Sequence, residues 1–160
     1  MVVSELIDLH RESVSPDWVD YNGHMNVAYY MLVFDHATDV VLENIGLNQN
    51  HREVTGNSVF VAEAHLTYER EAMENDELRV TTQLLDTDEK RIHMFHRMYL
   101  IGNEVVIATN ELMILSVNLT NRRVTPFAQS IKSKLHPIAL AHTSLPFPEK
   151  AGRIIKIPHR

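Results

Sequence analysis

The stretch that decides the fold is DWVDYNGHMNVAYYMLVFDHATDVVLENIG, which runs from Asp17 to Gly46. From Val27 to Ile45 its apolar side chains fall on nearly every side of a helical wheel, which predicts a helix enclosed by the rest of the chain. Asn26 is suited to cap the start of this helix, and Gly46 is suited to end it. A buried helix needs only one capping residue, yet a whole polar cluster stands directly in front of this one: Asp20, Asn22, Gly23, His24 and Asn26. The cluster is therefore a candidate reaction site.

Bulk composition sets limits on the class of protein. The chain has 160 residues, of which 44% are apolar and 22% charged, and this is ordinary for one globular domain. The net charge is -6 and Lys and Arg form no run, which disfavours a nucleic-acid or anionic-membrane partner. There is no cysteine, so disulfides, thiolate zinc sites and a cysteine nucleophile are excluded. The N-terminus lacks the layout of a signal peptide and no apolar run reaches about 18 residues, so we expect a cytoplasmic protein.

The chain after the helix is dominated by strand patterns. GLNQNHREVTGNS reads as a loop, and strands are then expected over residues 58–72, 77–86, 90–102 and 103–120, joined by short polar turns as in an antiparallel meander. Alternation predicts which side chains share a face. In the first strand that buried set is Phe60, Ala62, Ala64, Leu66 and Tyr68, and in the third it is Ile92, Met94, His96, Met98 and Leu100.

These patterns together predict an α+β fold in which one antiparallel sheet wraps around a long central helix. Residues 1–127 form this domain, and residues 128–160 are expected to add a helix over 129–142 and an extended, proline-rich tail. Such a sheet leaves edges and apolar surface open. We therefore expect subunits to pair edge to edge, as a homodimer or a homotetramer.

The polar cluster has two interpretations. Asp-Tyr-Asn-Gly is good turn chemistry in its own right, because Asn and Asp tolerate left-handed backbone and glycine adopts it freely. A helix N-terminus, however, also presents unpaired N–H groups and a partial positive charge, which suit a carbonyl oxygen that gains negative charge. A carboxylate a few residues upstream reaches the same place. Carboxylate and oxyanion site together are the minimum for acyl transfer.

The string Asp20-Tyr-Asn-Gly23-His24-Met-Asn26, followed by Tyr29 and Tyr30, resembles the motif D-x-x-G-H-x-N-x-x-Y. This motif is typical of hotdog-fold acyl-CoA thioesterases of the 4-hydroxybenzoyl-CoA thioesterase type. The predicted order of elements agrees with the hotdog fold over roughly residues 5–127. The resemblance implies thioester hydrolysis with an acyl-CoA substrate and no cofactor, because coenzyme A is part of that substrate.

The resemblance also implies roles for individual residues. Asp20 takes the position of the catalytic carboxylate, which either attacks the thioester carbon or activates a water, and backbone amides near Val27 hold the oxyanion. Gly23 lets the backbone pass close to the substrate. His24 and Asn26 are expected to organise the loop and the water rather than to attack.

Longer stretches of the sequence point to one group within this family. WVDYNGHMNVAYYMLVFDHATD, FHRMY, ATNELM and LPFPEKAGRIIKIP are similar to the thioesterases of carnitine breakdown, which release glycine betaine from betainyl-CoA. A trimethylammonium group calls for aromatic faces and a nearby negative charge. Trp18, the only tryptophan, stands two residues before Asp20, although packing against the helix end explains it equally well. The candidate substrate-binding residues are Trp18, Tyr21, Tyr29, Tyr30, Glu63 and Tyr68, with Glu63 and Tyr68 presented by a partner subunit.

Other functions stay open at this point. The chain has no HxH or HExxH motif, and His93 and His96 point to opposite faces of a strand, so we expect no metal site. Hotdog proteins that hydrate or dehydrate acyl thioesters use a different layout. The remaining alternatives are a general short- to long-chain acyl-CoA thioesterase and a non-catalytic module that binds acyl thioesters.

Overall fold

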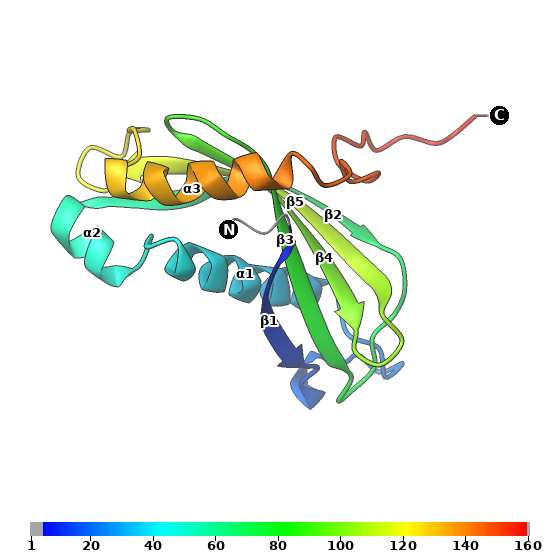
Figure 1. The fold of residues 1–160 in the computed structure, drawn as a ribbon. Coiled ribbons are helices and arrows are strands. Elements are labelled where there is room, and N and C mark those ends of the chain that lie inside the picture. The colour runs from blue at the N-terminus through cyan, green and yellow to red at the C-terminus, as the bar shows by residue number, and fades with distance from the viewer. Residues whose placement is uncertain (1–4, 160) are drawn as a thin grey trace.

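The structure is a computed structural model that describes residues 5–159. Its long helix α1 lies along one face of a five-stranded sheet (Figure 1). None of the helices within residues 5–159 is both long enough and apolar enough to cross a membrane. In chain order the elements are β1 (Ile7–Ser13), the short 3-10 helix η1 (Pro16–Trp18), α1 (Val27–Asn44), α2 (Gln49–Thr55), β2 (Asn57–Tyr68), β3 (Glu77–Thr87), β4 (Arg91–Leu100), β5 (Val105–Asn118) and α3 (Gln129–His142).

The sheet confirms the expected α+β arrangement but corrects its topology. The strand order is β1-β3-β4-β5-β2, and every neighbouring pair is antiparallel. The strands β3, β4 and β5 form the expected meander, whereas β2 pairs with β5 and not with β3. The segment between β2 and β3 is therefore a crossover that returns the chain past the start of α1. Tyr30 anchors it, because the Tyr30 hydroxyl donates to the Arg70 carbonyl at 3.3 Å and accepts from the Ala72 amide at 3.0 Å.

The core lies between α1 and the sheet. The inward set predicted for β4 is confirmed, since Ile92, Met94, His96 and Met98 are fully buried and Leu100 packs against the core. Complete burial of one such apolar side chain contributes about 1.5 to 3 kcal/mol. One part of the core surrounds the first half of α1, and a second part surrounds its last turns and includes side chains of α3. The helix is thus held against the sheet along its length.

A β-bulge in β2 corrects the predicted alternation. Val61 lies opposite Ile114 and Glu63 lies opposite Met113, so Ala62 is an extra residue without a partner. Because one inserted residue reverses the faces on one side of it, Phe60 does not share a face with Leu66 as predicted. Phe60 instead lies under the guanidinium of Arg122, with 4.9 Å from the guanidinium carbon to the ring centroid.

The segment after α1 is partly helical and not a loop throughout. Asn48 caps α2 by accepting a hydrogen bond from the His51 amide at 3.0 Å, and Gly56 ends the helix with a φ of 68°. These are ordinary helix start and stop signals. The apolar pattern does not predict α2, because the segment between these two signals carries few apolar residues.

A single chain does not enclose α1. Val27 at the start of the helix is 58% exposed, and the expectation of a wholly enclosed helix is not met within one subunit. The neighbouring strand β2 is an edge strand, and its Phe60, Val61 and Tyr68 are 39%, 42% and 49% exposed. Apolar surface is therefore open along one edge of the sheet and the adjacent side of the helix.

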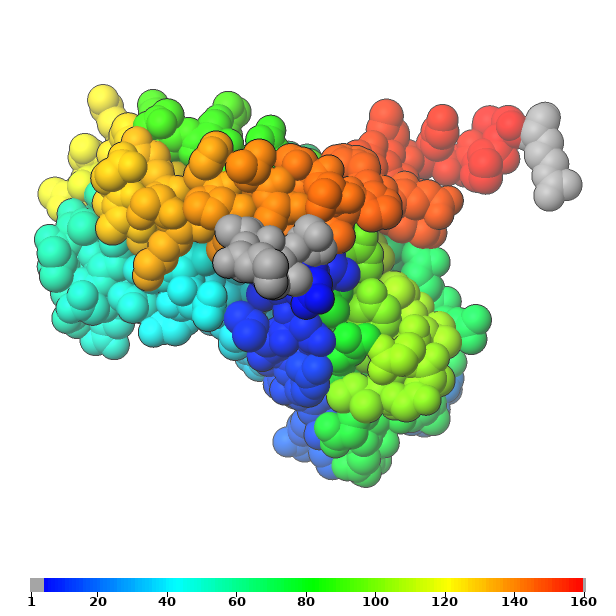
Figure 2. Space-filling model, viewed as in Figure 1, coloured from blue at the N-terminus to red at the C-terminus, as the bar shows by residue number. Residues whose placement is uncertain are grey.

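The C-terminal part matches its prediction in secondary structure. The helix α3 spans Gln129–His142 as expected, and an irregular segment follows it. Ile131 and Leu135 of α3 are buried in the same core as α1. A division of the chain after residue 127 stays a prediction. The last described residues extend away from the body of the molecule (Figure 2), and Ile154, Ile155 and Ile157 are 75%, 88% and 76% exposed.

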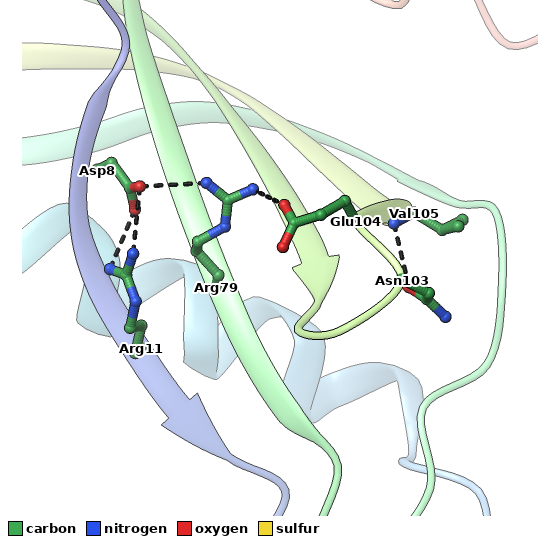
Figure 3. A network of polar contacts seen from close by, with 6 residues as sticks. All are labelled: Asp8, Arg11, Arg79, Asn103, Glu104 and Val105. Carbon is green, nitrogen blue, oxygen red and sulfur yellow. Dashed lines mark hydrogen bonds and ion pairs between the residues drawn. The ribbon is translucent and has the colours of Figure 1, made fainter.

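An ion-pair network fastens the edge strand β1 to its neighbour (Figure 3). Asp8 of β1 accepts hydrogen bonds from Arg11 at 3.2 Å and from Arg79 of β3 at 3.1 Å. Arg79 also pairs with Glu104 in the turn before β5, and its guanidinium lies 4.6 Å from the centre of the Tyr99 ring. Each exposed pair contributes at most about 1 kcal/mol, so the network guides strand placement more than it stabilises the fold.

Candidate active site

The polar cluster folds into a tight hairpin in front of α1. Val19 and Met25 form an antiparallel bridge, the Asp20 amide donates to the His24 carbonyl, and the Gly23 amide donates to the Asp20 carbonyl, both at 2.9 Å. Gly23 has a φ of 80°, and a Cβ built there would meet its nearest neighbour at an ordinary 3.8 Å. Backbone conformation, rather than crowding, therefore explains glycine at this position.

The Asp20 carboxylate is half-buried, and its two oxygens differ in their contacts. Oδ1 accepts a hydrogen bond from the Asn22 amide at 2.8 Å and a longer one from the His24 amide at 3.4 Å. For Oδ2, no hydrogen-bond donor is found within the described part of the chain. One oxygen therefore orients the side chain, and the other remains able to accept a proton or to attack a carbon.

The start of α1, directly after the hairpin that carries this carboxylate, presents an amide with no acceptor among the described residues. The Asn26 side chain accepts a hydrogen bond from the Ala28 amide at 3.0 Å, which confirms Asn26 as the N-cap. The Asn26 amide donates to the Trp18 carbonyl at 2.9 Å and so ties the hairpin to the helix. Among residues 5–159 no acceptor is found for the Val27 N–H. An unpaired donor at the positive end of a helix is suited to bind an anionic oxygen.

His24 contacts a residue that sequence reasoning missed. Its Nε2 lies 3.3 Å from a carboxylate oxygen of Glu71, and the backbones of His24 and Met73 form an antiparallel bridge. The side chains of His24 and Glu71 are 35% and 69% exposed. Glu71 belongs to the crossover after β2. No local motif signals this contact, because it depends on where the crossover passes.

Three of the predicted aromatic residues gather around the helix start. Trp18 stacks on Tyr29 with 5.5 Å between ring centroids and 12° between planes. The Tyr68 hydroxyl donates to the Val27 carbonyl at 3.4 Å, so Tyr68 reaches the site within its own chain. Tyr21 is 96% exposed at the tip of the hairpin. The rings of Trp18, Tyr29 and Tyr68 therefore lie around the start of α1.

Two other predicted residues lie elsewhere. Tyr30 is 4% exposed, burial raises the pKa of its phenol, and both hydrogen bonds of its hydroxyl hold the crossover. This geometry favours a structural role. Glu63 lies opposite Met113 on the sheet face away from α1, where it lines a cavity of about 300 Å³ with His65, His93 and Glu111. The structure does not bring Glu63 to Asp20 within one chain.

The larger cavities are also away from Asp20. Two of them measure about 630 Å³ each. The first lies beside the second half of α1, between Asp39 and Phe60, and the other lies against α3. Burial, followed by the charge of Asp35, raises the pKa of Asp39 in the first of these cavities. Asp20 lines neither of these two cavities.

Comparison with known proteins gives the family. Residues 14–135 match the thioesterase-like superfamily, and the chain belongs to this family. A betainyl-CoA thioesterase from Pseudomonas aeruginosa is 40% identical over 156 residues, which cover 98% of each chain. An L-carnitine dehydrogenase/betainyl-CoA thioesterase from Rhizobium meliloti is 39% identical over 140 residues, which are 88% of this chain and 28% of that longer protein. The expected class of enzyme, a thioester hydrolase, is confirmed.

A solved structure supports the fold independently. A Staphylococcus aureus protein described as hypothetical, whose structure was determined in complex with CoA, superposes with a TM-score of 0.91 at 28% identity. The similarity covers 98% of both chains, so it includes α3 and the tail. The expected hotdog fold is thereby confirmed.

Proposed function

We propose that the protein hydrolyses betainyl-CoA to glycine betaine and coenzyme A. The observation that carries the proposal is a half-buried carboxylate with one free oxygen, Asp20, placed before the unpaired amide of Val27 at the start of α1. The chain is also similar over almost its whole length to a betainyl-CoA thioesterase. Coenzyme A enters the reaction as part of the substrate.

The chemistry follows from the positions of these two groups. The thioester carbonyl oxygen accepts a hydrogen bond from the Val27 amide, which polarises the carbon. Asp20 then either takes a proton from a water that attacks this carbon or attacks it directly, forming an anhydride that water hydrolyses. Negative charge develops on the carbonyl oxygen, where the helix N-terminus stabilises it, and one such donor supplies roughly 10² to 10³ in rate. The C–S bond breaks and coenzyme A leaves as the thiolate, which takes the proton held by Asp20 in the first route and a proton from solvent in the second.

The other residues of the hairpin hold this geometry. Gly23 permits the turn that returns the chain to the helix, and Asn26 caps the helix while leaving the Val27 amide free. His24, held by Glu71, orients the water or the leaving thiolate. The acyl group is recognised by its charge. The trimethylammonium group lies one methylene from the carbonyl, within reach of the Trp18, Tyr29 and Tyr68 rings and of the exposed Glu71 carboxylate.

We also propose that two copies pair along β2. The strand is an edge strand of 12 residues, and the apolar side chains on it and on the adjacent start of α1 are substantially exposed. Antiparallel pairing about a two-fold axis satisfies the free backbone groups of both edges. It also brings the second half of one α1 toward the helix start of the other copy. A homodimer of this kind, alone or as half of a tetramer, encloses the reacting carbonyl.

A substrate series tests the acyl group. We would measure kcat/KM for betainyl-CoA, for its neutral isostere tert-butylacetyl-CoA, and for one short and one long straight-chain acyl-CoA. Recognition of the cation predicts a preference for betainyl-CoA over the isostere of about 1 to 3 kcal/mol, or roughly 5-fold to 150-fold. If a straight chain is the best substrate, thioester hydrolysis stands and the betaine assignment falls.

A matched pair of variants tests which aromatic side chain gives the preference for betainyl-CoA over the isostere. Trp18→Leu should reduce the ratio of betainyl-CoA to isostere more than it reduces hydrolysis of the isostere, because only the cation needs the indole face. Phe147→Leu removes an aromatic side chain that is 66% exposed in the tail, and it should leave the ratio unchanged. Equal losses on both substrates in Trp18→Leu would assign Trp18 to packing.

A further inference from the structure

A cluster of three side chains at the junction of β1 and α1 takes no part in the chemistry above. His10 and Glu12 belong to β1, and His36 belongs to α1. His10 Nε2 lies 3.0 Å from Oε2 of Glu12, and His36 Nδ1 lies 2.9 Å from the same oxygen and 3.0 Å from Oε1. Among the described residues this is the one group of three such side chains whose ligand atoms all lie within 4.8 Å of one another.

The fold itself brings these groups together. His10 and Glu12 are two residues apart on a strand, so both side chains point to the same face. They lie opposite Val80 and Leu78 of β3, which are buried in the core beneath α1, and so this is the face that carries the helix. His36 approaches from the helix. The rings of His10 and His36 are inclined by 64° with centroids 6.3 Å apart, so they converge on the carboxylate without stacking.

We propose that His10, Glu12 and His36 bind a divalent transition metal ion of the zinc class. Bonds of 2.0 to 2.2 Å to nitrogen and oxygen place tetrahedral ligand atoms about 3.3 Å apart. The separations between each histidine nitrogen and the Glu12 oxygen therefore need to open by only a few tenths of an ångström, and all three ligand atoms lie within 4.8 Å of one another. Two imidazoles with one carboxylate favour zinc-class metals over magnesium or calcium, which prefer oxygen ligands.

The burial of the cluster suits a bound ion with a water as its fourth ligand. The side chains of His10 and Glu12 are 14% and 22% exposed, which partly shields them from solvent, and that of His36 is 40% exposed, which leaves a path for the ion. The site joins an edge strand to the central helix. A bound metal therefore stabilises the attachment of β1, and the proposed thioester chemistry at the start of the helix does not require it.

The test is metal binding by the tag-free full chain after treatment with a chelator. We would titrate Zn²⁺ against a chromophoric chelator and Co²⁺ by its visible absorption, and follow the thermal midpoint in parallel. We expect one ion per chain, Co²⁺ absorption bands typical of a low-symmetry site, and a higher midpoint of thermal unfolding when Zn²⁺ is bound. His36→Ala removes a ligand on the exposed side and should weaken binding by roughly 10-fold to 100-fold or more. Glu12→Gln keeps the shape of the side chain and should weaken binding similarly.

His93→Ala is the matched control. It removes a histidine that also pairs with a glutamate, at 2.8 Å from Glu111, but among the described residues no third ligand atom lies within 4.8 Å of both. This variant should bind Zn²⁺ like the unmodified protein. The proposal is overturned if the unmodified chain binds less than one ion, or if His93→Ala loses as much affinity as His36→Ala. Removal of the metal should leave the initial rate of thioester cleavage unchanged, so this result is independent of the proposed function.

Discussion

In the proposed mechanism, one oxygen of Asp20 holds the turn and the other takes part in the chemistry. Because Oδ1 accepts hydrogen bonds from two backbone amides, the turn needs a hydrogen-bond acceptor at this position but does not need a charge. Aspartate and asparagine meet that need equally well. The turn and the reaction therefore respond differently to the same substitution.

We predict that Asp20→Asn folds normally and lowers kcat/KM by about 10² to 10⁴ or more, because the amide can neither attack nor accept a proton. Asp17→Asn, three residues earlier on an exposed side chain, is the control and should keep its activity. Activity of the unmodified enzyme should also fall in acid, while the residual rate of Asp20→Asn should not follow it. A variant that binds acyl-CoA and still cleaves it at full rate would remove Asp20 from the mechanism.

At the scale of elements, His96 joins α1, β3 and β4 through one buried ring. Thr38 of α1 donates its hydroxyl proton to the Phe34 carbonyl at 2.8 Å, so His96 Nε2 must donate to Thr38. His96 Nδ1 then accepts from the Thr82 hydroxyl at 2.8 Å. This network assigns a neutral ring, and burial lowers the pKa of His96 to about 3.

The buried ring predicts a loss of stability in mild acid. Because the pKa of His96 is lower in the folded state, the unfolded chain takes up the proton first as pH falls. The free energy of unfolding should therefore be highest above pH 6.5 and should fall as the pH decreases toward 3. At pH 5 the loss that comes from His96 alone is about 2 kcal/mol. Burial also lowers the pKa of His142, so both residues act in the same direction.

Urea unfolding at pH 7, 6 and 5 measures this decline. His96→Gln should be less stable at pH 7, but its free energy of unfolding should change less with pH. His136→Gln, which replaces an exposed histidine on α3, should retain the full decline. An unchanged slope in His96→Gln would assign the acid sensitivity to other groups.

The sequence predicted the elements that carry strong periodicity. The inward set of β4 was correct because its alternation is long and uninterrupted. The range of α3 was also correct, although Pro137 lies inside this helix and no described side chain caps its start. The face of Phe60 was wrong because nothing in the local alternation reveals the extra residue at Ala62. The predicted pairing of β2 was wrong because the short polar segment after it reads as a hairpin turn. The chain instead crosses over there, past Tyr30, and β2 pairs with β5.

The candidate site divides in the same way. The residues contiguous in sequence, from Asp20 to Val27, were predicted together and lie together. Contacts that depend on the path of the crossover were not predictable, and Glu71 beside His24 is the example. Glu63 was expected to reach the site from a partner subunit. Within one chain the register places it on the sheet face away from α1, so its role stays a prediction.

At the scale of the whole molecule, the open edge predicts that activity depends on assembly. We expect the enzyme to sediment as a dimer or a tetramer. Val61→Lys places a charge on the β2 edge, at a side chain that is 42% exposed, and should shift the protein toward monomer and lower kcat/KM by roughly 10-fold or more. Leu140→Lys places the same charge on α3 at a side chain that is 62% exposed, and should change neither property. A fully active monomer at micromolar concentration would refute pairing along β2.

The stacking of Trp18 on Tyr29 has an optical consequence. Because the chain contains one tryptophan, its indole emission comes from a single position two residues before Asp20. A change in that emission during a titration with substrate therefore reports on the proposed active site, without a label and without contributions from other indoles. The loss of stacking on unfolding should change the same signal. One fluorescence channel can thus follow both occupancy of the site and integrity of the hairpin that carries it.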